Sequence, residues 1–448
     1  MPVILKNSDN EFIIRDPFYT GEWVLDGEAI ALYLDFLRCI RGLALDDGTR
    51  ASGESSALSI PEPLASFVSE GLPLKCDFSP DKIAHSIERS DRGIITPPVP
   101  IVEITPHCNY HCPWCFVPRE PKAPMSMETI RGELVAPLLE LGTEVFVLTG
   151  GEPSVELGRL ESVCSIIREE ANKNGVAAKI ALLTNGSRLK DLSKRYKEMG
   201  ISNIQVSVIS ADPVKDQKMR GIPASVNAVE EAFEGTYTAV QEGINVSFNF
   251  VLVPSLKGVP SNIDEIPEMV AWARRLGVYM IRIVPVVCSG EAAKNGVFLT
   301  LDELRHAREL IARELSHSDD KTVVYSPIGS DVPPEKPVYC RAGNDVIYVS
   351  ADGRTYPCNN LIYPTFQCGK LPLGAGGDNI AAIWRESPVL EAFRQPNEIC
   401  AECARCNLRT ECGGQCRAQL YWRYKQINLE KQPERCYSMP GRESFSVC

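Results

Sequence analysis

From about residue 100 onward, short β-branched runs alternate with longer amphipathic runs, and this alternation limits the fold more than any other feature of the sequence. The amphipathic runs have the apolar spacing of helices, and several end at a glycine, which is typical of a helix C-terminus. Six strand and helix units in series predict an α/β fold with a parallel sheet, either open or curled into a partial barrel. The predicted strands are IVEIT (101–105), EVFVLTG (144–150), KIALLTNG (179–186), NIQVSVI (203–209), NVSFNFVLV (245–253) and MIRIVP (280–285).

Two regions of different character flank this alternating segment. Residues 1–95 contain EFIIRDPFYTGEWVLDGEAIALYLDFLRCIRG, which predicts a strand, a turn, a second strand and a helix, and so a small α+β module. The Pro-rich linker ITPPVP separates this module from the first core strand. From about residue 330 to residue 448, Cys, Gly, Pro and Asn replace the regular patterns, which indicates a loop-rich, Cys-rich domain held together by metal.

Charge and hydropathy exclude two classes of partner. The formal net charge of −11 argues against a nucleic-acid backbone, because phosphate binding depends on an excess of Lys and Arg. The first residues, MPVILKNSDNEF, lack the pattern of a signal peptide, and no apolar run is long enough to span a membrane. We therefore expect a cytoplasmic protein with no membrane partner.

The chain carries seventeen cysteines, and ten of them form two groups with ligand-like spacing, three at 108–115 and seven within 340–436. Disulfide frameworks belong to short secreted chains, so clustered thiols in a large cytoplasmic protein predict bound metal. The other seven cysteines are mostly scattered, as small buried hydrophobic residues are.

The first group lies in TPHCNYHCPWCFVP, three residues after the first predicted strand and so at the carboxyl edge of the sheet, where such folds place their chemistry. A closed zinc site would need a fourth ligand, for which His107 and His111 are the candidates. An iron-sulfur cluster held by three thiolates would instead leave one iron open for a small molecule. The position at the strand ends favours the iron-sulfur cluster.

The C-x3-C-x2-C pattern of CNYHCPWC resembles the signature of the radical SAM enzymes. The resemblance covers about residues 98–320 and implies a partial (β/α)6 barrel. It also implies that Cys108, Cys112 and Cys115 hold a [4Fe-4S] cluster whose fourth iron binds S-adenosylmethionine (SAM).

Four further motifs match the family in order: GGEP (150–153), TNG (184–186), VSVIS (206–210) and KMRG (218–221). The resemblance implies that Glu152 binds the ammonium group of SAM and that Gly150 and Gly151 let the backbone approach the cofactor. The family's usual His-Asp pair is replaced here by Asp216 and Gln217. The remaining predicted cofactor contacts are Trp114, Asn185, Ser207 and Arg220.

The second group of cysteines is similar to the seven-cysteine SPASM domain, which carries auxiliary [4Fe-4S] clusters. Two of these cysteines alone would also suit a zinc ribbon, but the match of all seven spacings favours SPASM. The resemblance implies three [4Fe-4S] clusters in total and leaves the nearer auxiliary cluster one ligand short, to be supplied by Cys368 or Cys400 or left open. It assigns Cys340, Cys358 and Cys416 to that nearer cluster and Cys403, Cys406, Cys412 and Cys436 to the farther one.

The resemblance also implies a reaction. A reduced cluster splits SAM into methionine and a 5′-deoxyadenosyl radical, which takes a hydrogen atom from an unactivated carbon, and the electron comes from a donor such as flavodoxin or ferredoxin. An auxiliary cluster can then accept the electron left on the substrate. Cys288, just past the sixth predicted strand, is a candidate catalytic residue, and a buried structural thiol is the alternative.

The 107 residues before Cys108 bear on the substrate. SPASM enzymes mostly modify peptides or proteins, and leader-dependent peptide maturases often begin with a winged-helix-like module that recognises the leader. We therefore expect a ribosomally made precursor peptide that gains a crosslink, a thioether or another oxidation. The module could also be a structural cap. The alternative functions are sulfatase-maturase-like oxidation, dehydrogenation of a small molecule, and a non-catalytic iron-sulfur or zinc-binding protein.

Overall fold

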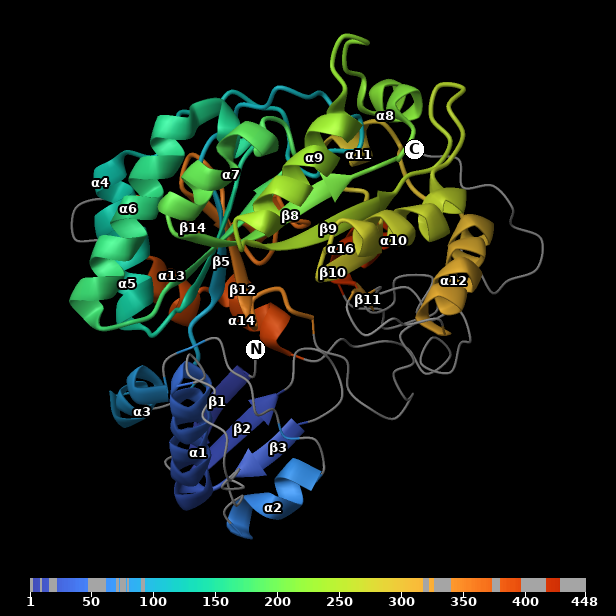
Figure 1. The fold of residues 1–448 in the computed structure, drawn as a ribbon. Helices are drawn as coiled ribbons and strands as arrows, with labels where there is room; N and C mark the ends of the chain where they lie inside the picture. The colour runs from blue at the N-terminus through green and yellow to red at the C-terminus, as the bar shows by residue number, and fades with distance from the viewer. Residues whose placement is uncertain are drawn as a thin grey trace, which may run out of the picture.

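The computed structural model shows a small N-terminal unit beside a larger α/β body that contains the long sheet (Figure 1). The ranges that it describes are residues 3–8, 10–15, 22–46, 62–69, 72, 78, 80–89, 93–316, 322–325, 340–372, 379–395 and 416–427.

The N-terminal unit is an antiparallel sheet in the order β3-β2-β1-β4, covered by helices. Alternate residues of β2 and β3 are buried, among them Phe12, Ile14, Trp23 and Leu25, and they share a hydrophobic cluster with residues of α1. The two predicted strands and the helix are confirmed here, while the predicted turn at residues 16–21 lies outside the described residues, and β1 and β4 were not predicted. The elements are β1 (Val3–Ser8), β2 (Glu11–Arg15), β3 (Glu22–Leu25), α1 (Gly27–Asp46), α2 (Glu62–Ser69), α3 (Pro80–Arg89) and β4 (Gly93–Ile94).

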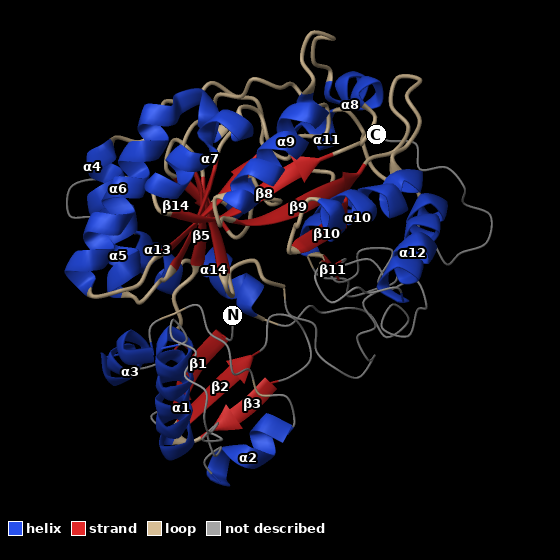
Figure 2. Ribbon diagram, in the orientation of Figure 1, coloured by secondary structure: helices blue, strands red, loops and turns tan. Residues whose placement is uncertain are grey.

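The body is built on one ten-stranded sheet, and the six predicted strands lie in it side by side as parallel neighbours. Figure 2 shows these strands curving beneath the helices that cover their outer side. The predicted α/β partial barrel is confirmed, with strand ends within two residues of those expected. In spatial order the strands are β11 (Val323–Tyr325), β10 (Met280–Pro285), β9 (Asn245–Leu252), β8 (Ile201–Val208), β7 (Lys179–Thr184), β6 (Val145–Thr149), β5 (Val99–Glu103), β12 (Val346–Val349), β13 (Arg354–Tyr356) and β14 (Gly369–Lys370).

Local signals in the sequence set the helix ends. The Asp212 side chain accepts hydrogen bonds from two backbone N–H groups at the start of α8, and Asn227 caps α9 in the same way. Gly175 ends α6 in the left-handed conformation. The helices of the barrel are α4 (Met127–Thr129), α5 (Ala136–Glu140), α6 (Leu157–Asn174), α7 (Leu189–Glu198), α8 (Pro213–Arg220), α9 (Ala228–Gln241), α10 (Ile266–Arg275), α11 (Gly290–Lys294) and α12 (Leu301–Ser316), with a π-helical segment, Ile130–Val135, between α4 and α5.

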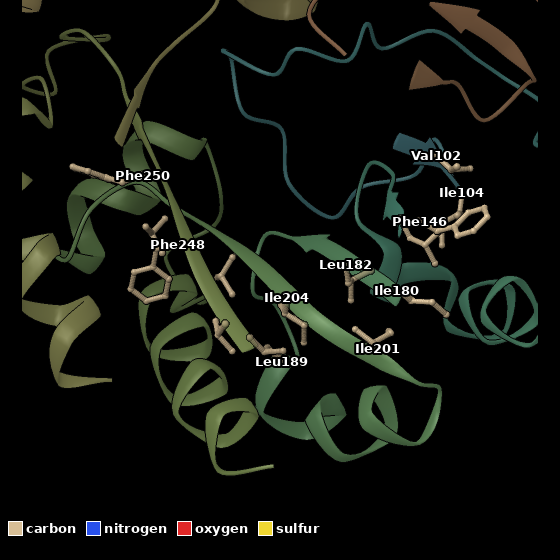
Figure 3. Close-up of a cluster of buried hydrophobic side chains, with 14 of the residues drawn as sticks. Val102, Ile104, Phe146, Ile180, Leu182, Leu189, Ile201, Ile204, Phe248 and Phe250 are labelled. Carbon is tan, nitrogen blue, oxygen red and sulfur yellow. The ribbon is translucent and has the colours of Figure 1, made fainter. Parts of the chain in front are cut away.

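The core of the body lies between the sheet and its helices. Figure 3 shows side chains such as Phe146, Ile180, Leu182 and Ile204 pointing from the outer side of the strands, and all four are buried. Because side chains alternate along a strand, the other residues of the same strands face the interior of the barrel.

The C-terminal region extends the sheet, which the sequence did not predict. β12 pairs in parallel with β5, and β13 and β14 continue the sheet as antiparallel strands. The indole N–H of Trp384 donates to the carbonyl of Thr96, so this region is also fixed to the linker before β5. The helices described here are α13 (Ile380–Glu386), α14 (Pro388–Arg394) and α16 (Arg417–Tyr424).

A search of the described helices for one both long and apolar enough to cross a membrane finds none.

Candidate active site

A cavity of about 1900 Å³ occupies the interior of the barrel. Ligand pockets for single small molecules usually measure roughly 300–1,000 Å³, so this cavity has room for a cofactor together with a substrate.

The two walls of the cavity differ in polarity. The inward residues of β5, β6 and β7 are mostly apolar, whereas those of β8, β9 and β10 carry amide, hydroxyl and guanidinium groups. Ser207, Asn249 and Arg282 are in register across three neighbouring strands and line the cavity together. The polar wall comprises Asn203, Gln205, Ser207, Asn245, Ser247, Asn249 and Arg282.

The loop after β5 carries Cys108, Cys112 and Cys115. Cys108 lies five residues after the end of β5, and all three cysteines line the cavity. Two backbone hydrogen bonds hold its start against the GGEP turn: Gly151 N–H donates to Thr105 O (2.8 Å) and Glu152 N–H donates to His107 O (2.7 Å). A Cβ at position 151 would lie 2.2 Å from His107 O. The glycine is therefore required for the approach of the turn to the cysteine loop, whereas the sequence predicted an approach to the cofactor. Gly150 packs in the same way against Thr105 O.

The three thiols of this loop interact with one another. Burial, with a smaller contribution from the neighbouring Cys112 thiolate, raises the pKa of Cys108 to about 11 and that of Cys115 to about 12. Burial also raises the pKa of Cys112. Metal ligation would remove these protons, because a thiol binds metal as the thiolate.

The donor set fits an iron-sulfur cluster better than a zinc ion. Among the described residues, no three His, Cys, Asp or Glu side chains converge as ligands do around one ion. A [4Fe-4S] cluster does not need such convergence, since each thiolate binds a different iron atom. His107, one candidate for a fourth zinc ligand, instead pairs with Glu156, and His111 lines the cavity.

Glu152 lies between the turns that follow β6 and β7. Its carboxylate is fully buried and accepts hydrogen bonds from Thr184 Oγ1 (2.9 Å), the N–H of Asn185 (2.7 Å) and the N–H of Ser154 (3.0 Å). Residues 149–151, 184 and 185 line the cavity, but Glu152 is absent from its lining. The carboxylate joins the GGEP turn to the TNG turn, and its contact with the SAM ammonium group stays a prediction.

Asn185 and Arg220 lie at the cavity, as the sequence predicted. The Asn185 amide donates to Asn109 Oδ1 (2.9 Å) in the cysteine loop. Arg220 is buried, forms an ion pair with Asp216 (2.9 Å) and donates to the carbonyl of Ser207 (2.9 Å). Asp216 thus orients the arginine, although Asp216 and Gln217 replace the His-Asp pair that is usual in the family.

The ring of Tyr110 lies 5.5 Å from the Arg220 guanidinium carbon. The sequence did not single out Tyr110 or Asn109, because both lie between the predicted metal ligands. The structure brings them into contact with the predicted cofactor residues Arg220 and Asn185. Ser207 and Trp114 also line the cavity, and the Trp114 side chain is largely buried in the main core.

The second group of cysteines reaches the same cavity. Cys340, Cys358 and Cys416 line it and pack with aromatic residues of the C-terminal region. Burial raises the pKa of Cys358 well above its usual value, and Cys340 and Cys416 are close enough to contribute. The residues that hold SAM and those that hold the nearer auxiliary cluster would therefore face one shared space.

Cys368 does not join these three thiols. It lies beside Ser387 and packs on the main core instead of lining the cavity. The other predicted ligands, namely Cys400, Cys403, Cys406, Cys412 and Cys436, lie outside the described residues.

Cys288 lies just after β10 and next to residues that line the cavity. Its thiol is buried, donates to the carbonyl of Ala292 (3.5 Å) and does not line the cavity, although Val286 and Val287 do. The thiol is therefore buried, and a catalytic role for Cys288 stays a prediction.

Comparison with known proteins gives the family. Residues 102–273 match the model of the radical SAM superfamily, and residues 340–407 match the SPASM model, an iron-sulfur cluster-binding domain. The GTP 3′,8-cyclase of Aquifex aeolicus is 30% identical over 281 residues, which cover 57% of this chain and 80% of that protein. The GTP 3′,8-cyclase of Tolumonas auensis is 30% identical over 195 residues, 42% of this chain and about half (53%) of that protein.

Solved structures share the fold at low sequence identity. SuiB of Streptococcus suis bound to its precursor peptide SuiA superposes with a TM-score of 0.58 at 14% identity, covering 96% of this chain and 98% of SuiB. The enzyme anSMEcpe with bound AdoMet gives a TM-score of 0.54 at 15% identity, covering 72% of this chain and 90% of that one. The chain therefore belongs to the radical SAM superfamily, as an enzyme with a C-terminal SPASM domain.

Proposed function

We propose that this radical SAM enzyme is a peptide maturase: it takes a hydrogen atom from a ribosomally made precursor peptide and leaves a crosslink, a thioether or another oxidation. The observation that carries the proposal is the extent of the likeness to SuiB. That likeness covers 96% of this chain, including the N-terminal unit, whereas the match to the Aquifex GTP 3′,8-cyclase covers 57%.

The N-terminal unit offers a surface on which an extended peptide can pair. β3 is an edge strand of its sheet, and Val24 at its centre is 52% exposed. A peptide that adds a strand to such an edge gains main-chain hydrogen bonds. We assign residues 1–95 to this recognition module, 98–320 to the radical SAM barrel and 330–448 to the SPASM domain.

The polar wall of the cavity suits a peptide backbone. Gln205 and Asn249 present amide groups that can both donate to carbonyls and accept from N–H groups, and the facing wall of β5 to β7 can cover apolar side chains. A peptide with one polar edge and one apolar side would match both walls.

The cofactors are proposed from the residues that fit them. Cys108, Cys112 and Cys115 would hold the SAM-binding [4Fe-4S] cluster, with Asn185, Ser207 and Arg220 near SAM and Trp114 bordering it. Gly150 and Gly151 would serve SAM indirectly, by seating the cysteine loop. When bound, SAM and the cluster supply the hydrogen-abstracting radical.

The nearer auxiliary cluster would lie at Cys340, Cys358 and Cys416. We propose a second auxiliary cluster at Cys403, Cys406, Cys412 and Cys436. The electron would come from a flavodoxin or a ferredoxin.

The test is anaerobic reconstitution of the full chain with iron and sulfide, followed by incubation with SAM, a reductant and the peptide encoded beside its gene. A peptide maturase converts that peptide, and a mass loss of about 2 Da would indicate crosslinking or oxidation. An unchanged peptide, together with conversion of another substrate, would reject the proposal.

The sequence relatives favour a second candidate, a small-molecule reaction like that of the GTP 3′,8-cyclases. Incubation with GTP under the same conditions tests it, because a cyclised nucleotide differs from GTP in its chromatographic retention. Sulfatase-maturase-like oxidation remains the protein-modifying alternative, and a peptide fragment that carries a sulfatase motif tests it in the same assay.

A further inference from the structure

The unexplained feature of the cavity is Glu103, the last residue of β5. Its side chain forms part of the cavity wall and is shielded from bulk water. All of its contacts converge on one carboxylate oxygen. Oε2 accepts hydrogen bonds from the Tyr348 hydroxyl (3.0 Å) and the Ala351 N–H (3.0 Å), and it pairs with the Lys122 ammonium group (3.2 Å).

The other oxygen, Oε1, has no hydrogen-bond partner among the described residues, although it is buried. A buried acceptor without a partner is unfavourable, and more so when it is charged. The Lys122 and Glu103 side chains are only 2% and 0% exposed, so water does not offset this cost. Glu103 lines the cavity, and its Oε1 is a buried acceptor that none of the described residues satisfies.

The location of Glu103 is close to the chemistry. Lys122 follows the cysteine loop, and Tyr348 belongs to β12 at the start of the C-terminal region. The ring of Tyr348 packs edge-on against Phe116, the residue after Cys115, with the two ring centroids 6.4 Å apart. The carboxylate therefore lies on the side of the cavity where the cysteine loop meets the C-terminal region.

We propose that Oε1 of Glu103 accepts a hydrogen bond from an N–H or O–H group of the substrate and thereby positions it in the cavity. The choice of a peptide as the substrate rests on the proposed function. The inference that the substrate donates a hydrogen bond does not rest on the proposed function, because it follows from the unpartnered Oε1 of Glu103 alone.

The substitution Glu103→Gln tests the proposal sharply. The three donors around Oε2 hold the carboxamide oxygen on their side, so the NH2 group takes the place of Oε1. The variant thus presents a donor where the wild-type protein presents an acceptor. Glu161→Gln is the matched control, because Glu161 of α6 forms a surface ion pair with Arg195 of α7.

The experiment uses the full reconstituted chain with SAM and a positional-scanning library of acetylated tetrapeptide amides. Short peptides limit any contribution from the N-terminal unit. GTP and inosine triphosphate, which lacks the exocyclic amino group, form a second arm. The readouts are binding by calorimetry and the concentration that half-maximally stimulates deoxyadenosine formation. The visible absorbance of the clusters and SAM binding confirm that each variant is folded.

We expect Glu103→Gln to raise the half-saturating concentration of active peptides at least about tenfold, while Glu161→Gln leaves it unchanged. Replacing the contacted amide by an ester should weaken binding to the wild-type protein but not to Glu103→Gln. If Glu103→Gln weakens binding of GTP and no peptide binding depends on Glu103, the role of Glu103 in positioning a substrate would stand and the peptide function would be rejected. Equal affinities for wild type and variant, or no Glu103-dependent ligand in either arm, would overturn the inference.

Discussion

The carboxylate of Glu152 accepts a hydrogen bond from the hydroxyl of Thr184 at 2.9 Å, and this contact joins the turn after β6 to the turn after β7. The same carboxylate accepts the N–H of Asn185, whose side chain contacts the cysteine loop. The GGEP and TNG motifs are therefore hydrogen-bonded to each other, and TNG is also hydrogen-bonded to the cysteine loop.

Glu152→Gln should destabilise the protein even without cofactor. The amide NH2 would face one of the three donors that now surround the carboxylate, and an unmatched buried donor costs about 1–3 kcal/mol. Chemical unfolding of the apoprotein measures the change in the free energy of unfolding. Glu169→Gln, in an exposed pair with Arg131, serves as control and should change it by less than about 0.5 kcal/mol. Equal stability of wild type and Glu152→Gln would contradict the supporting role.

Gly151→Ala should impair loading of the first cluster. The new methyl group would lie 2.2 Å from His107 O, so the cysteine loop must move. Iron content should fall by about four atoms per chain, which is the number of iron atoms in one [4Fe-4S] cluster. Gly158→Ala is the matched control, because its Cβ would meet nothing within 4 Å. Full iron content in Gly151→Ala would show that the close approach is dispensable.

Assembly of the first cluster should depend steeply on pH. Burial raises the pKa values of Cys108 and Cys115 to about 11 and 12, so both thiols are protonated near neutrality in the apoprotein. Below these values the thiolate fraction of each grows about tenfold per pH unit, and ferrous binding should strengthen as pH rises from 7 to 9. Alkylation of the apoprotein, read by mass spectrometry, should be slower at these thiols than at the exposed Cys39. Faster alkylation than at Cys39 would contradict the burial argument.

Val24→Asp should weaken precursor binding if the edge of β3 receives the peptide. A charged residue of low strand propensity on this edge disfavours strand addition, and we expect an affinity loss of roughly tenfold. Fluorescence anisotropy with a labelled precursor measures the affinity. Deoxyadenosine formed without peptide should not change. Leu315→Asp is the control, because Leu315 is an exposed residue of α12. An equal loss of affinity in this variant would indicate a general defect.

Cys368→Ala should leave the iron content and the cluster spectra unchanged. Its thiol packs beside Ser387, apart from Cys340, Cys358 and Cys416. A loss of iron on this substitution would place Cys368 among the ligands after all.

The sequence predicted the barrel well because its strands carry β-branched and aromatic residues at the alternate positions that face the buried outer side, as Ile281 and Ile283 do in β10. It did not predict that β12 pairs with β5, because this contact joins residues far apart in the chain and β12 has only four residues. The motifs located the site, but they could not show that Glu152 turns toward Thr184. For Glu103, the available signal was one carboxylate within the apolar run IVEIT, whose partners come from two distant segments.

The most direct test of the central claim is deuterium transfer from a precursor peptide. The full chain, reconstituted with iron and sulfide, is reduced with SAM and the peptide encoded beside its gene, synthesised with perdeuterated residues. A radical SAM peptide maturase should yield deuterated deoxyadenosine together with a modified peptide. Unlabelled deoxyadenosine and an intact peptide, in a preparation that cyclises GTP, would contradict the proposed function.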